Sequence, residues 1–142
     1  MCQKSSCSLR VFVYGTLKPG EANYELYCSH KVVDAQKAWV RGELYALPQG
    51  YPAMTQGDNV VHGYLLSFAN PEILSSLDEL EDYSPQRLHS ENLYNRIQVE
   101  IFDLENNSLG EAWVYLMDFA KVRQLKGTPQ TNGLWSGKRI NT

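Results

Sequence analysis

The feature that most constrains this chain is a short apolar run that breaks abruptly into a loop containing glycine. Residues 11–14 read Val-Phe-Val-Tyr, and residues 15–20 read Gly-Thr-Leu-Lys-Pro-Gly. This switch predicts a strand over residues 9–14, buried on both faces, that ends in a tight loop. Glycine has no Cβ and tolerates positive φ, so the amides around Gly15 could face an anion or a carbonyl oxygen. The alternative is a strand that ends at an ordinary turn.

The length of 142 residues fits one domain with a sizeable core. We expect this domain to span residues 1–142, with residues 1–8 frayed. Residues 119–142 are more polar, and we expect them to pack over the core as a tail through Leu134 and Trp135.

The composition is that of an ordinary globular domain, with 43% hydrophobic and 20% charged residues. The formal net charge is −3 and no basic block is present, which argues against a nucleic-acid partner. No apolar run is long enough to cross a membrane, and the first residues lack the apolar core of a signal peptide. Three cysteines, an odd number, fit reduced thiols, so we expect a cytoplasmic protein.

The residue types that bind metals are too scattered to predict a metal site. Cys2 and Cys7 lack the C-x2-C spacing of a zinc site, and no histidine cluster completes one. The three histidines are more typical of surface or hydrogen-bonded residues; they are His30, His62 and His89. We expect neither a metal nor another cofactor.

Periodicity and turn residues predict about six strands. We expect them over residues 9–14, 35–47, 53–55, 60–68, 94–104 and 111–117, with hairpin turns at residues 57–59 and 106–107. Gly42, inside the second of these strands, is expected at a bulge or a close contact. Two short helices are expected over residues 21–28 and from Asn70 to about Asp82. The sum is an α+β domain, a small mixed β-barrel that is strongly bent.

Side chains of the first helix that we expect to pack on the core are Tyr24, Leu26 and Tyr27. In the second helix, one acidic residue falls on the apolar face. At roughly 100° per residue, the apolar stripe consists of Ile73, Leu74, Leu77 and Leu80. Glu81 falls between Leu77 and Leu74, whereas the other acids of the helix lie at the edge of the stripe or opposite it.

A carboxylate on an apolar face is costly unless it is paired or used. Desolvation would raise the pKa of Glu81 towards neutrality and make it a better proton acceptor. Two plainer interpretations remain open. The helix could end near Leu80 so that Glu81 turns back to water, or Glu81 could form a salt bridge with Arg96 or Arg41.

Five short segments, in order from residue 9 to about residue 136, match motifs of one known family. Residues 13–20 (VYGTLKPG) match its N-terminal signature, and residues 77–83 (LDELEDY) match its "LD-x-x-E-G-Y" segment. Residues 94–99 (YNRIQV) match a "Y-x-R-x-x-V" strand, residues 112–115 (AWVY) a strand ending in tyrosine, and residues 133–135 (GLW) a terminal "G-x-W". On these motifs the chain resembles the γ-glutamylcyclotransferase-like (AIG2-like) proteins. Two departures are Asp82, where a glycine is usual, and an insert at residues 84–92.

The resemblance implies an enzyme that cleaves a small γ-glutamyl amide without a cofactor. The substrate's own α-amine attacks its γ-carbonyl, which releases 5-oxoproline and a free amine or amino acid. The family's catalytic glutamate corresponds to Glu81. The loop amides expected to hold the substrate's α-carboxylate or the developing oxyanion are those of Tyr14, Gly15, Thr16 and Leu17.

The resemblance also draws attention to Tyr94 and Tyr115, which could hydrogen-bond the substrate or Glu81, or could simply fill the core. We expect residues 48–52 and 84–92 to build the part of the pocket that receives the leaving amine. Two other functions remain open. One is a non-catalytic module that binds a small molecule in the same pocket, and the other is removal of a γ-glutamyl protecting group within a biosynthetic pathway.

Overall fold

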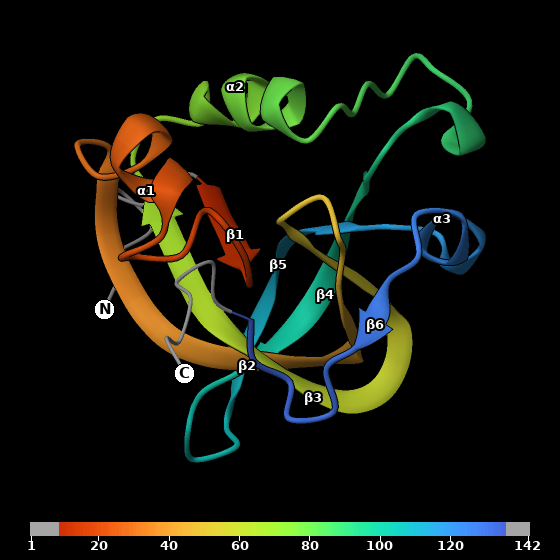
Figure 1. Cartoon of the computed structure of the whole chain (residues 1–142). Coiled ribbons are helices and arrows are strands. Elements are labelled where there is room, and N and C mark those ends of the chain that lie inside the picture. The colour runs from red at the N-terminus through yellow and green to blue at the C-terminus, as the bar shows by residue number, and fades with distance from the viewer. Residues whose placement is uncertain (1–8, 136–142) are drawn as a thin grey trace.

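Two long antiparallel strands bend around the molecule and form the largest part of its sheet (Figure 1). The computed structural model describes residues 9–135. In it, β2 (Val32–Ala46) and β3 (Pro52–Phe68) pair along their length and are joined by residues 47–51. Strands of 15 and 17 residues are long enough that the right-handed twist of paired strands curls the sheet strongly.

Across residues 9–135 the sheet has six strands, and it closes into a ring. The other strands are β1 (Leu9–Val13), β4 (Asn95–Phe102), β5 (Ser108–Leu116) and β6 (Thr128–Pro129). The order is β3-β1-β5-β4-β2-β6, and β2 also pairs with β3, which closes the ring. The pairing of β1 with β5 is parallel, whereas the other pairings are antiparallel, so the sheet is mixed. The predicted α+β class with a strongly bent mixed sheet is confirmed.

The prediction of a hairpin turn at residues 57–59 is wrong, because β3 runs through this point without a break. Gly42 of β2 lies opposite Asn59, but the next residue, Glu43, lies opposite Thr55. Residues 56–58 are therefore looped out of the ladder as a bulge, and bulges favour the same small and polar residues as turns do. The predicted bulge or close contact at Gly42 is confirmed.

Helices cover the outside of the ring and are short. Within residues 9–135 they are α1 (Ala22–Tyr27), α2 (Ile73–Leu80) and α3 (Phe119–Gln124), with a 3-10 turn at His89–Glu91. The first two match the predicted helices, but α3 and β6 were not predicted and lie in the segment expected to be an irregular tail. That tail contacts the core through Trp135 as predicted, whereas Leu134 is 51% exposed. Leu26 is 78% exposed, so its predicted packing is also wrong.

The core lies on both faces of β1. Val11 and Val13 belong to an apolar cluster that also contains Leu77 of α2. Phe12 and Tyr14 belong to a second cluster, inside the ring. Successive side chains of a strand point to opposite faces, so the apolar run from Val11 to Tyr14 is buried on both faces, as predicted.

Residues 1–8 and 136–142, which include the predicted frayed N-terminus, lie outside the described residues. No helix within residues 9–135 is long and apolar enough to cross a membrane.

Gly63 allows β3 to approach the end of β1 closely. A Cβ at this position would lie 2.1 Å from the carbonyl oxygen of Val13 and 2.8 Å from Cζ of Phe12. We therefore expect Gly63→Ala to lower the free energy of unfolding by about 1–3 kcal/mol, measured by urea denaturation. Gly57→Ala is the matched control, since its Cβ would meet the movable side chain of Glu43. Equal effects of the two variants would contradict this account.

Candidate active site

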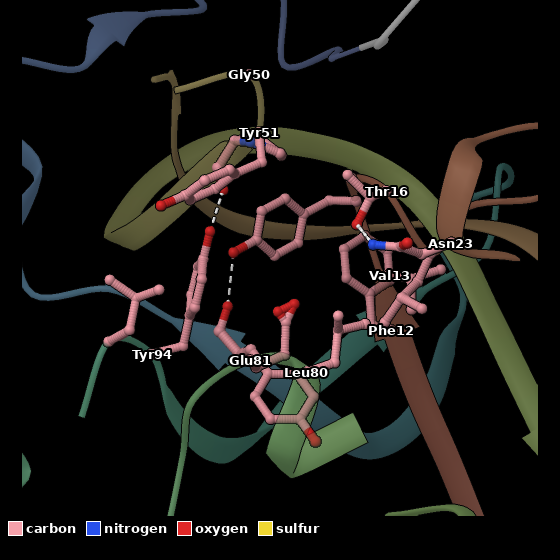
Figure 2. Close-up of a pocket in the computed structure, with 15 residues that line it drawn as sticks. Phe12, Val13, Thr16, Asn23, Gly50, Tyr51, Leu80, Glu81 and Tyr94 are labelled. Atoms are coloured by element: carbon pink, nitrogen blue, oxygen red, sulfur yellow. Dashed lines mark hydrogen bonds between the residues drawn. The ribbon is translucent and has the colours of Figure 1, made fainter. Parts of the chain in front are cut away.

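A pocket of about 270 Å³ opens beside the end of β1. It is bounded by the loop after β1, the turn before β3, the C-terminal end of α2, the residues before β4 and the end of β5 (Figure 2). The structure brings all the predicted site residues to this pocket: Tyr14, Gly15, Thr16, Leu17, Glu81, Tyr94 and Tyr115.

The loop after β1 is shaped by close contact with the turn before β3. A Cβ on Gly15 would lie 2.5 Å from Cγ of Pro52, so only glycine lets the two segments meet at this distance. Thr16 is tied to α1, because its carbonyl accepts a hydrogen bond from the Asn23 amide at 2.9 Å and its hydroxyl accepts one from Nδ2 of Asn23 at 2.9 Å. Asn23 also lines the pocket and was not predicted from the sequence.

The amides of this loop are available to a ligand. Among the described residues, the backbone N–H groups of Gly15, Thr16 and Leu17 have no hydrogen-bond acceptor, whereas the Lys18 amide donates to the carbonyl of Gly15 at 3.0 Å. Neighbouring backbone donors that line a concave site are a common way to hold an anion.

Tyr14 fixes the start of the loop to two other strands. Its hydroxyl donates a hydrogen bond to the carbonyl of Tyr115 at 2.6 Å and accepts one from the amide of Met54 at 3.2 Å. Burial, together with the nearby Glu81, raises the pKa of the Tyr14 hydroxyl well above its usual value. Tyr14 therefore stays neutral and acts as a rigid link between β1, β3 and β5.

Glu81 lies just beyond the last residue of α2. One plainer interpretation is half correct, because the helix does end at Leu80, but Glu81 lines the pocket instead of turning to water. The helix ends in a Schellman motif, in which the Tyr83 amide donates to the Asp78 carbonyl at 2.9 Å and the Asp82 amide to the Glu79 carbonyl at 3.2 Å.

The second plainer interpretation, a salt bridge to Glu81, is wrong for both named arginines. Arg96 pairs with Asp78, and the guanidinium of Arg41 lies over the ring of Trp39. Burial raises the pKa of Glu81 to about 7. A carboxyl group with this pKa can both accept and donate a proton near neutral pH.

The two other predicted tyrosines present their rings to the pocket but not their hydroxyls to Glu81. The Tyr94 hydroxyl donates to the carbonyl of Pro52, and the Tyr115 hydroxyl donates to Oδ1 of Asp78 at 2.7 Å. Burial raises the pKa of both hydroxyls, so both stay protonated. Within residues 9–135, no group of three or more potential metal ligands comes together.

Comparison with known proteins agrees with this geometry. The sequence profile described as "Gamma-glutamyl cyclotransferase, AIG2-like" matches residues 11–137. The chain belongs to this family. It is 32% identical over 108 residues to "Gamma-L-glutamyl-butirosin B gamma-glutamyl cyclotransferase" of Niallia circulans, a match that covers 76% of this chain and 67% of the relative.

Solved structures show the same fold. An AIG2-like protein of Mus musculus superposes with a TM-score of 0.66 at 22% identity, covering 94% of this chain and 98% of the mouse chain. YkqA of Bacillus subtilis superposes with a TM-score of 0.62 at 22% identity. The match covers 89% of this chain but 39% of YkqA, so this chain spans well under half of that protein.

The segment expected to be an insert, residues 84–92, does not line the pocket, contrary to prediction. Of the two segments expected to do so, residues 50–52 contribute and residues 84–92 do not. The side chain of Asn92 binds the backbone of Ser84, which closes the insert on itself. Its His89 contacts the residue before α3, since Nε2 of His89 lies 2.8 Å from Oδ1 of Asp118. Leu93, immediately after the insert, does line the pocket.

The second departure from the family, Asp82, has a simple physical meaning. Its φ is 54°, in the left-handed region that the residue after a Schellman cap adopts and that glycine adopts most easily. A glycine at this position, as in the "LD-x-x-E-G-Y" motif, would adopt the turn without strain. Asp82 adopts this conformation with some strain, and its carboxylate pairs with Arg87 at 3.0 Å on the surface.

We expect Asp82→Gly to raise the free energy of unfolding by about 0.5–1 kcal/mol, because relief of left-handed strain outweighs loss of an exposed ion pair. Thermal and urea denaturation would measure this. Arg87→Gln removes the ion pair alone and should change stability by less than about 0.5 kcal/mol. A less stable Asp82→Gly variant would contradict the strain argument.

Burial of Glu81 also predicts a pH-dependent effect on stability. Its folded-state pKa is raised from 4.5 to about 7, so its contribution to stability is lost as pH rises between these values and stays lost above pH 7. Glu81→Gln is neutral throughout. We therefore expect it to gain stability over the wild type by on the order of 2 kcal/mol at pH 8, and by little near pH 4.5. Glu79→Gln, on the exposed side of the same helix, is the control and should show no such trend.

Proposed function

We propose that this protein is a γ-glutamyl cyclotransferase in which Glu81 is the general acid and base. The observation that carries the proposal is a half-buried carboxylate, without a partner among the described residues, that shares a pocket with a row of loop amides that have no acceptor among those residues. The family to which the chain belongs supports the same activity. The relative from Niallia circulans, whose name specifies a γ-L-glutamyl compound, supports a small γ-glutamyl amide as substrate.

The reaction needs no nucleophile from the protein. The substrate's α-amine nitrogen forms a bond to its own γ-carbonyl carbon, and the bond from that carbon to the leaving nitrogen breaks. The products are 5-oxoproline and a free amine. The α-amine and the γ-carbonyl belong to the same molecule, and their reaction closes a five-membered ring. Holding the substrate in the folded conformer therefore supplies much of the rate enhancement.

Glu81 moves one proton from the attacking nitrogen to the leaving nitrogen. As a carboxylate it accepts this proton from the substrate's α-ammonium group, which frees the nitrogen lone pair for attack. The attacking nitrogen loses its second proton to the solvent as it becomes the amide nitrogen of 5-oxoproline. As a carboxylic acid Glu81 then donates its proton to the leaving nitrogen, so the enzyme ends in its starting state. A pKa of about 7 suits both steps at neutral pH.

The loop of residues 14–17 orients the substrate against Glu81. Its free amides would bind either the α-carboxylate or the oxyanion that develops on the γ-carbonyl. The loop is held in place by Pro52 packed on Gly15 and by the hydroxyl of Tyr14. Because these contacts exist before any ligand arrives, little reorganisation is needed when charge develops.

The activity is tested by incubating the protein with a panel of γ-glutamyl dipeptides and γ-glutamylamines and measuring 5-oxoproline. We expect turnover of at least one compound, and a loss of about 10²–10⁴-fold in kcat for Glu81→Gln. Activity should rise with pH through about 7, as Glu81 loses its proton. Glu79→Gln is the matched control and should retain activity.

Two results would overturn the proposal: no turnover of any panel member, or a Glu81→Gln variant as active as the wild type. Binding of a γ-glutamyl compound without turnover, measured by calorimetry, would instead support a non-catalytic binding module.

A further inference from the structure

A second acidic residue of α2, Asp78, forms a buried ion pair one helical turn before Glu81. Its Oδ1 lies 2.9 Å from Nε of Arg96 on β4, and the two side chains are 15% and 13% exposed. The same oxygen accepts the hydrogen bond from the Tyr115 hydroxyl at 2.7 Å. Arg96 and Tyr115 are partners across the β4–β5 ladder, so Asp78 ties the helix to both strands at one point.

Arg96 is held firmly by two aromatic rings. Its guanidinium carbon lies 4.5 Å from the ring centre of Trp113 and 5.0 Å from that of Tyr83. Contacts of this kind stabilise a cation and restrict its side chain. Tyr83 is also the residue whose amide completes the Schellman motif at the end of α2.

These contacts lie on both sides of Glu81 in the sequence. Asp78 precedes Glu81 by three residues and Tyr83 follows it by two, and both contact Arg96. The intervening backbone is fixed by the Schellman hydrogen bonds. The backbone that carries Glu81 is therefore held on both sides, by the Asp78–Arg96 pair and by the contact of Arg96 with Tyr83.

The pair also balances charge close to Glu81. The ionisable groups around Glu81 come from each neighbouring element: Tyr14 after β1, Tyr51 before β3, Tyr94 and Arg96 on the side of β4, Tyr115 on β5 and Asp78 on α2. Burial raises the pKa of the hydroxyls of Tyr14, Tyr94 and Tyr115, so these three stay protonated near pH 7. The ion pair of Asp78 with Arg96 supplies the formal charges of this set. Asp78, Glu81 and Arg96 all influence the Tyr115 hydroxyl, the first two raising its pKa and Arg96 lowering it.

We propose that Asp78 and Arg96 form a charge-neutral clamp that positions Glu81 in the pocket. Its importance for the reaction rests on the proposed function, but the clamp itself is a property of the fold. The two residues should shift the pKa of Glu81 in opposite directions when each is removed. Without Asp78 the remaining cation favours the ionised form of Glu81, and without Arg96 the remaining anion disfavours it.

The test is an NMR titration of the side-chain carboxyl carbon of Glu81 in ¹³C-glutamate-labelled protein, assigned with Glu81→Gln. We expect the proton-dissociation constant of Glu81 to increase at least threefold in Asp78→Asn and to decrease at least threefold in Arg96→Gln. The double variant should return to within threefold of the wild type. Arg96→Lys, which keeps the charge, should also stay close to the wild type.

Arg87→Gln is the matched control, since it breaks the exposed ion pair of Arg87 with Asp82 at the same helix end and should not shift the titration. A purely structural role for the pair would move both single variants in the same direction, because loosening the turn hydrates Glu81 in each. Shifts of the same sign, or no shift, would overturn the proposal.

The titration needs no turnover, so it separates this proposal from the proposed function. If the wild type releases no 5-oxoproline but the signed shifts appear, the function fails and the clamp stands. If the wild type is active, the pH at which kcat/KM is half-maximal should move down in Asp78→Asn and up in Arg96→Gln. Circular dichroism and urea denaturation establish which variants are folded. If neither single charge variant folds, the double variant and Arg96→Lys provide the test. A proton-dissociation constant of Glu81 that differs more than threefold from the wild-type value in either variant would overturn the proposal.

Discussion

The parallel pairing of β1 with β5 is the constraint on which the pocket depends. Parallel strands end at the same edge of a sheet, so this pairing brings the loop after β1 together with the last residues of β5. The ladder itself is short, with Val11 opposite Trp113 as its register pair. The Tyr14 hydroxyl extends this junction beyond the ladder, since it joins the end of β1 to the carbonyl of Tyr115 and the amide of Met54. The junction beside the pocket is thus held by the short β1–β5 ladder and by the hydrogen bonds of the Tyr14 hydroxyl.

The sequence predicts which residues meet at the pocket better than it predicts the elements around them. Glu81 was placed beside Leu74 and Leu77 by helical periodicity, although the helix ends one residue earlier. The prediction held because the Schellman turn keeps Glu81 on the side of the helix where a further turn would have put it. The loop amides are predicted from the local pattern in which an apolar strand breaks into a loop at Gly15. Both signals are local, and local signals are the ones a single sequence carries well.

The errors arose where contacts distant in sequence decide the outcome. Residues 57–59 have turn chemistry, but pairing with β2 keeps Asn59 in the ladder and leaves residues 56–58 as a bulge inside one long strand. The short strand β6 exists because it pairs with Tyr45 and Ala46, some eighty residues earlier in the chain. The insert at 84–92 was expected at the pocket, but the contact of His89 with Asp118 holds it near α3. None of these pairings has a signature within its own segment.

Four carboxylates lie near the end of α2, and one of them, Glu79, is exposed. The other three show how one acid can be kept different from its neighbours. Asp78 is buried and neutralised by Arg96, Asp82 is exposed and pairs with Arg87, and Glu81 is buried with no partner among the residues described. If Asp78 lacked its arginine, two buried carboxylates one turn apart would compete for a single proton, and neither would titrate independently. Neutralising one acid and exposing another leaves burial as the cause of the raised pKa of Glu81. In the proposed reaction this arrangement would confine proton transfer to Glu81, because Asp78 is paired with Arg96 and Asp82 faces the solvent.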